Sequence, residues 1–252
     1  MNLTLFENLI LCSGDIPSFD ETVSFLKNER YWSWYNEIKP LTDRYTLFEN
    51  DAVGVPPMNE VFYKFILNNH RIAKHKEFIQ CYYDKYCIHD DMNGFWKFNY
   101  GIDWGDNNIK TWTYPFKDAD GNSTGVLCKK KLNIKLMKAY MSFLKEIYVL
   151  SYLNSLGFNA KYDEQMDYAG YDIIVQSNLL YGIKIYADTK EANSKSKIKF
   201  SERNNKLVKI NKISIPITNQ YVIGDTRVPT NKQLEQITKM ITSNCKGKVV
   251  FN

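Results

Sequence analysis

The stretch from residue 171 to residue 190 limits the possible folds more than any other part of this chain. It contains two short runs of β-branched and aromatic residues on either side of the polar turn Ser177-Asn178. This pattern is typical of a β-hairpin, which brings its two outer ends together. Asp172 begins the first predicted strand and Asp188 ends the second. The sequence therefore predicts two carboxylates at one end of a sheet.

A lysine accompanies these carboxylates. Lys190 lies two residues after Asp188, and alternate residues of a strand share a face. Two adjacent carboxylates repel each other unless a cation lies between them. Oxygen ligands suit Mg²⁺, which keeps waters and a substrate phosphate in its remaining coordination positions. A nearby lysine can hold or deprotonate the attacking water, or stabilise charge that develops on phosphorus.

The spacing of Asp172, Asp188 and Lys190 resembles the motif of the PD-(D/E)XK nuclease superfamily, which has the restriction-endonuclease-like fold. The resemblance implies that Asp172 and Asp188 bind the metal ion and that Lys190 positions the nucleophilic water. The implied cofactor is Mg²⁺, for which Mn²⁺ can substitute. Tyr171 replaces the proline that often precedes the first aspartate. Lys184 is a reserve candidate, because it shares a face with Asp188 in a regular strand and relatives tolerate a migrated lysine.

A long helix is predicted from about Leu132 to Leu156, because apolar residues recur at spacings of three and four. Gly157 follows, where a left-handed C-terminal cap is common. Glu146 lies on the apolar face, where an uncompensated carboxylate is costly. In the family that the hairpin resembles, a helix before the hairpin often carries a glutamate that points at the site. The resemblance thus implies that Glu146 assists by metal ligation or by supporting the ligands. The alternative is a flanking side chain that reaches solvent.

Further elements are predicted around the hairpin. Residues 158–163 form a strand between the long helix and the hairpin, which gives the order helix, strand, hairpin of the family's core. Apolar strands are expected at 213–217 and 220–223, and a capping-box sequence starts a helix of about 231–243. The expected fold class is α/β (α+β): a mixed β-sheet flanked by helices with a restriction-endonuclease-like core, and an N-terminal mainly helical domain. The nuclease core is placed at 129–252.

Charge is distributed unevenly along the chain. Residues 1–128 contain 12 basic and 18 acidic side chains, whereas residues 129–252 contain 21 and 10. A basic half favours a polyanionic partner, with double-stranded DNA first in line. The alternative is a solvated lysine-rich surface. A cationic run after the hairpin is expected to follow the phosphate backbone, and its candidate DNA-binding residues are Lys195, Lys197, Lys199, Arg203 and Lys206.

The first half carries less specific signals. Residues 58–86 have helical spacing and predict one long helix, or two with a joint near Asn68-Asn69. The aromatic cluster at 31–35 favours a core or an interface over base stacking. By elimination, residues 1–128 are assigned as a recognition or dimerisation region, so a homodimer is expected.

Composition excludes several classes of protein. There is no apolar run of eighteen residues and no signal-peptide pattern. The five cysteines are scattered and show no zinc-site spacing, which favours reduced thiols in a cytoplasmic protein. The expected function is a magnesium-dependent DNA endonuclease, most like a type II restriction endonuclease. The alternatives are a nuclease subunit of a phage-defence, transposition or phage DNA-processing machine, or an inactive nuclease-fold DNA-binding module.

Overall fold

The computed structural model describes part of the chain, namely residues 9–42, 58–86, 95–103, 109–115, 125–187, 210–217, 221–245 and 247–248. The chain forms two compact units. We call them the helical unit (Met1–Leu3, Arg30–Phe62 and Ala73–Met141) and the sheet unit (Thr4–Glu29, Tyr63–Ile72 and Ser142–Asn252). This division differs from a boundary at residue 128, because two segments of the first half belong to the sheet unit.

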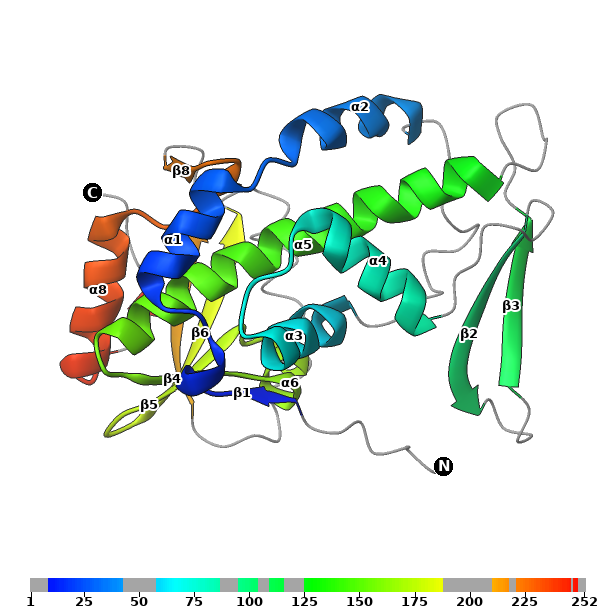
Figure 1. Ribbon diagram of the computed structural model, residues 1–252. Coiled ribbons are helices and arrows are strands. Elements are labelled where there is room, and N and C mark those ends of the chain that lie inside the picture. Colours follow the sequence, from blue (N-terminus) through cyan, green and yellow to red (C-terminus); the bar gives the residue numbers. More distant parts are fainter. Residues whose placement is uncertain are drawn as a thin grey trace. The chain divides into compact units, whose positions relative to one another are not determined.

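A six-stranded mixed sheet forms the centre of the sheet unit (Figure 1). Its strand order is β1-β4-β5-β6-β7-β10. Pairing is antiparallel from β1 to β6 and parallel from β6 to β10. The strands are β1 (Ile10–Leu11), β4 (Asn159–Asp163), β5 (Ile173–Gln176), β6 (Leu180–Ala187), β7 (Asn211–Ile217) and β10 (Gly247–Lys248). A mixed sheet with flanking helices confirms the expected fold class at this level.

The helix α5 (Gly125–Ser155) enters the sheet unit at Ser142 and leads into β4. It ends as the sequence predicts. Gly157 has a φ of +81°, and the Phe158 and Gly157 amides donate to Leu153 and Asn154 respectively. This is a Schellman cap, in which glycine meets no Cβ penalty. The helix begins earlier than the apolar spacing indicated.

The helix α1 (Phe19–Asn28) covers α5 within the sheet unit. It starts with a capping box, in which Ser18 accepts from the Glu21 amide and the Glu21 side chain accepts from the Ser18 amide. The Phe19 ring packs against Tyr148 and Tyr152 of α5, with ring centroids 5.2 and 5.4 Å apart. Aromatic packing of this kind fixes one helix on another.

The helix α8 (Asn231–Thr242) lies against the parallel strands. Thr230 and Gln233 form the predicted capping box. The Gln233 side chain also donates to the Pro216 carbonyl of β7 at 2.8 Å. On the neighbouring strand, the Tyr181 hydroxyl donates to the Ile241 carbonyl. These buried bonds tie the amphipathic helix to β6 and β7.

The remaining elements of the described residues are short or belong mainly to the helical unit. The aromatic residues Tyr31 and Tyr35 are buried, which agrees with a core role. The region 58–86 forms two helices, and the first ends at Asn69 as the sequence allowed. The elements are η1 (Ser13–Asp15), α2 (Trp32–Thr42), α3 (Met58–Asn69), α4 (His75–Tyr86), β2 (Phe95–Asp103), β3 (Ile109–Pro115), α6 (Glu164–Tyr168), β8 (Val222–Ile223) and β9 (Thr226–Arg227).

Within the described ranges, no helix is long and apolar enough to cross a membrane. Cys12 and Cys245 are free thiols.

Candidate active site

The register of the β5–β6 hairpin decides which residue faces Asp172. Ile173 pairs with Ile183, and the Asp172 amide donates to the Ile183 carbonyl at 2.8 Å. The strands are joined by residues 177–179. Asp172 lies just before this paired region, and its side chain is bonded to Lys184, the reserve candidate for the catalytic lysine.

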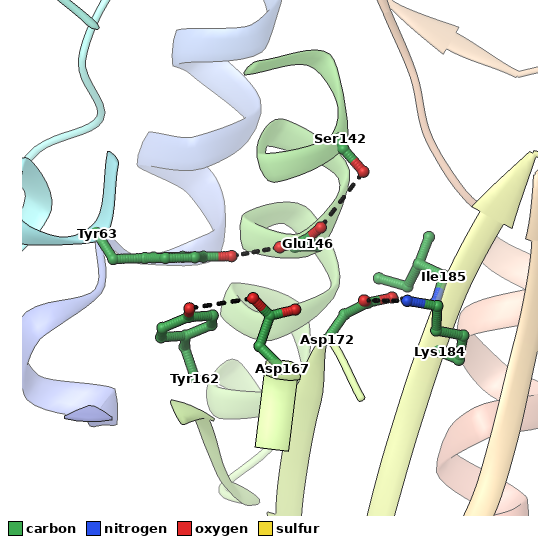
Figure 2. A network of polar contacts seen from close by, with 8 residues as sticks. All are labelled: Tyr63, Ser142, Glu146, Tyr162, Asp167, Asp172, Lys184 and Ile185. Carbon is green, nitrogen blue, oxygen red and sulfur yellow. Dashed lines mark hydrogen bonds and ion pairs between the residues drawn. The ribbon is translucent and has the colours of Figure 1, made fainter. Parts of the chain in front are cut away.

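Both carboxylate oxygens of Asp172 accept hydrogen bonds (Figure 2). The Lys184 Nζ atom donates to Oδ1 at 2.8 Å, and the Ile185 amide donates to Oδ2 at 2.5 Å. Asp172 is only 5% exposed, whereas the Lys184 side chain is 28% exposed. The hairpin thus fixes the direction of a buried carboxylate and leaves its lysine partner accessible from one side.

Glu146 reaches this region from α5 and is buried. The Tyr63 hydroxyl of α3 donates to Glu146 Oε2 at 2.5 Å, and the Ser142 hydroxyl donates to Oε1 at 3.3 Å. Figure 2 shows the carboxylate between the Tyr63 side and the Asp172 side of the network. The side chain does not reach solvent, so the flanking alternative does not apply.

A third carboxylate, Asp167 of α6, was not predicted from the sequence. The Tyr162 hydroxyl of β4 donates to Asp167 Oδ2 at 3.3 Å. The rings of Tyr63 and Tyr162 are stacked, with centroids 3.7 Å apart. The alternation of polar and apolar residues over 159–163 is a sequence signal that places Tyr162 on the core side of a strand, and the structure agrees. No comparable pattern places Asp167, because it lies on a short turn of helix between two strands.

Burial and mutual repulsion alter the acidity of these groups. Burial raises the pKa of Glu146 well above its usual value, and the neighbouring charges of Asp172 and Asp167 raise it further. Burial also raises the pKa of Asp172, although Lys184 and the Ile185 amide oppose that change. The charged forms of these carboxyl groups are thus disfavoured, and the charges of Lys184 and Lys212 offset this only in part.

The lysine keeps its proton. Burial tends to lower the pKa of Lys184, but Asp172 and then Glu146 and Asp167 outweigh it, so the pKa is raised. Lys212 on β7, which pairs with Gly182, shows the opposite: burial and then the nearby Lys184 lower its pKa. Lys184 is consequently an ammonium donor at neutral pH and can stabilise negative charge.

Position 182 of the hairpin has room for glycine only. A Cβ atom at this position would lie 2.2 Å from Cδ1 of the Tyr171 ring, a distance that real Cβ contacts do not adopt. Tyr171 is buried and packs against Ala169 and Ile174. The strand position two residues before Lys184 is therefore closed to any side chain while the ring stays in place.

The pKa of Glu146 predicts a stability change for Glu146→Gln. A carboxyl group whose folded pKa is raised above 4.5 destabilises the folded state increasingly as the pH rises through that pKa. Glutamine removes this effect and keeps an oxygen for Tyr63. We expect Glu146→Gln to raise Tm at pH 8 by at least about 2 °C, the shift that ~1 kcal/mol gives in a chain of this size. The gain should vanish towards pH 4.5.

The control for this prediction has the opposite sign. Hydrogen bonds from the Ser18 side chain and amide lower the pKa of exposed Glu21, so its charge stabilises the fold above its unfolded pKa. Glu21→Gln should thus lower Tm slightly at pH 8. Thermal unfolding of both variants across pH is the measurement, and a Glu146→Gln variant less stable than the parent at pH 8 would contradict the assignment.

Several predicted residues cannot be placed. Asp188 and Lys190 lie outside the described residues, as do the candidate DNA contacts Lys195, Lys197, Lys199, Arg203 and Lys206. Among the residues that the structure does describe, no three His, Cys, Asp or Glu side chains form a metal-binding group. Asp172, Glu146 and Asp167 form a charged cluster with Lys184, which contacts Asp172. Hydrogen bonds from Ile185, Tyr63 and Tyr162 hold the oxygens of the three carboxyl groups.

Comparison of the chain with protein-family models, curated proteins and solved structures finds no match in any of the three.

Proposed function

We propose that this protein is a magnesium-dependent DNA endonuclease that hydrolyses phosphodiester bonds and is most like a type II restriction endonuclease. The observation that carries the proposal is the ion pair between Lys184 and Asp172 on adjacent strands, with buried Glu146 beside it. Repelling carboxylates attract a divalent cation, and an ammonium group at the same place attracts a phosphate. A metal-dependent nuclease can use both to stabilise the charge that develops during phosphodiester hydrolysis.

The order of elements supports a restriction-endonuclease-like core. α5, β4, β5 and β6 follow one another as helix, strand and hairpin, which is the core order of the superfamily that the hairpin resembles. Asp172 precedes the first hairpin strand and Lys184 lies within the second. This support is topological, so the proposed function depends mainly on the side chains.

The donor set fits a hard cation. Carboxylate oxygens suit Mg²⁺, and the charge of Asp172 raises the pKa of Glu146, so a cation between them would relieve repulsion. Asp172 is the proposed first ligand, and Asp188 or Glu146 the second. When bound, Mg²⁺ would polarise the phosphate and activate a water molecule. The ammonium group of Lys184 would stabilise the charge that develops on the phosphate oxygens.

Lys184 becomes the preferred catalytic lysine in this proposal, with Lys190 the alternative. If Lys184 is the lysine of the acid-x-lysine motif, the acidic position falls on Gly182, where Tyr171 leaves no room for a side chain. The second carboxylate must then come from another element. Glu146 of α5 is the described candidate.

An inactive DNA-binding module is the second candidate function. The observation that favours it is that both carboxylate oxygens of Asp172 already accept hydrogen bonds, one from Lys184 and one from the Ile185 amide. A cation would have to displace or share the Lys184 contact. In either case we propose that the basic second half contacts double-stranded DNA. We also propose that the protein is a homodimer and that residues 1–128 have a recognition role.

A metal-dependent cleavage assay tests the proposed function. The purified protein is incubated with a genomic DNA mixture that offers many sequences, in Mg²⁺, Mn²⁺, Ca²⁺ or a chelator. We expect discrete duplex cuts in Mg²⁺ and Mn²⁺ and none with the chelator. Salt-dependent binding of duplex DNA without cleavage in any metal would support the inactive module instead.

A further inference from the structure

The stacked pair Tyr63–Tyr162 lies directly against the candidate site. Tyr63 comes from α3 and Tyr162 from β4, and both side chains are almost completely buried. Their rings are 3.7 Å apart between centroids and inclined by 23°. Each hydroxyl donates to a different carboxylate, Tyr63 to Glu146 and Tyr162 to Asp167. The two tyrosines therefore stack with nearly parallel rings, and each of their hydroxyl groups is hydrogen-bonded to an acidic side chain.

This arrangement restricts movement of the carboxylates. A buried tyrosine hydroxyl requires a hydrogen-bond partner, and a bond to an ionised group is stronger than a neutral one. The Tyr63 bond to Glu146 measures 2.5 Å. Phe143 packs on Tyr63 at 5.8 Å between centroids, so Tyr63 has aromatic neighbours on α5 as well as on β4. The rings cannot turn without disturbing this packing.

The carboxylates held in this way face the proposed metal ligand. In Figure 2, Glu146 and Asp167 lie between the tyrosine pair and Asp172. The charges of Asp172 and Asp167 both act on Glu146. Without a fixed donor, repulsion would favour a rotamer of Glu146 that points away from Asp172.

We propose that Tyr63 and Tyr162 are positioning residues of this site. The Tyr63 hydroxyl holds the Glu146 carboxylate towards Asp172, and the Tyr162 hydroxyl holds Asp167 behind it. The catalytic consequence rests on the proposed nuclease function, whereas the coupling between Tyr63 and Glu146 does not. Tyr63 belongs to the half of the chain assigned to recognition, so that half also contributes to the site.

The test is a double-mutant cycle of Tyr63→Phe and Glu146→Gln. Phenylalanine keeps the ring and the stack and removes only the hydroxyl. We expect Tyr63→Phe to slow single-turnover cleavage about tenfold and to raise the half-saturating Mn²⁺ concentration, since supporting residues of metal sites have effects of this size. In the Glu146→Gln background, Tyr63→Phe should have almost no further effect on either quantity.

Two further variants separate positioning from a general loss of buried bonds. Tyr181→Phe removes a buried hydroxyl that donates to the Ile241 carbonyl and should leave the cleavage rate within about twofold, because no carboxylate loses its donor. Tyr162→Phe should give a smaller loss than Tyr63→Phe, because its bond is longer. Asp167→Asn should remove any further effect of Tyr162→Phe.

A second cycle is measured by urea unfolding without metal or DNA, with Glu146→Leu in place of Glu146→Gln, because glutamine would keep an oxygen for the Tyr63 hydroxyl. Non-additive effects of Tyr63→Phe and Glu146→Leu are expected there too. If the parent protein cleaves and the two substitutions act additively on rate and Mn²⁺ dependence, the positioning inference is overturned and the nuclease proposal stands. If the parent does not cleave in any metal, the nuclease proposal fails, and additive unfolding effects would then overturn the coupling as well.

Discussion

Asp172→Asn is expected to abolish DNA cleavage, with a loss of at least about 10³-fold, the upper range for removal of one preorganised electrostatic group. Asparagine has the same shape and can still accept from the Ile185 amide, but it lacks the charge that would hold the cation. Duplex DNA binding should be unchanged or tighter, because a negative charge beside the phosphate is removed. Single-turnover cleavage and binding in Ca²⁺ are the measurements.

Asp163→Asn is the matched control for this prediction. Asp163 lies in the same sheet unit, where its side chain accepts from the Met166 amide and caps α6. Asparagine is an equally good cap, so cleavage should stay close to the parental rate. If the Asp172→Asn variant cleaves DNA at the parental rate, the metal site lies elsewhere.

Lys184→Met is expected to slow cleavage by at least about a hundredfold, the usual scale for a group positioned at the reacting centre. The reason is geometric: the Lys184 Nζ atom lies 2.8 Å from Oδ1 of Asp172. Its raised pKa keeps it charged, so the loss should show no recovery at alkaline pH. The pH profile of the single-turnover rate measures both effects.

Lys190→Met and Lys232→Met complete this comparison. Lys232 is exposed at the start of α8, so its substitution changes the charge equally and should alter the rate by no more than about twofold. From the sequence, Lys190 ranked above Lys184, and the register of the hairpin now reverses that order in the proposal. A more severe effect of Lys190→Met would restore the original ranking and return Asp188 to the site.

The hairpin was predictable from the sequence, but its facing pairs were not. Two runs of β-branched residues around a polar turn are enough to predict two strands. Asp188 was expected beside Asp172 because the outer ends of two strands of equal length meet. β5 has 4 residues and β6 has 8, so the start of β5 lies beside the middle of β6, where the Lys184 side chain bonds to Asp172. Strand length depends on neighbouring strands such as β7, which local sequence does not report.

The helical periodicity of α5 located Glu146 on a buried face, and the structure agrees. The contact between Tyr63 and Glu146 could not be predicted from the sequence, because 83 residues separate the two side chains and no local pattern indicates such a contact. The segment Tyr63–Ile72 joins the sheet unit through packing, which composition does not reveal.

The close approach of Tyr171 to Gly182 has a consequence for how this hairpin can change. An acidic residue at position 182 would stand two residues before Lys184 and restore the spacing of an acid-x-lysine motif. No single substitution can introduce it, because the Tyr171 ring occupies the space of the new Cβ atom. The aromatic ring would have to be lost first, at the expense of its packing against Ala169 and Ile174. The two positions are therefore expected to change in a fixed order, with residue 171 before residue 182.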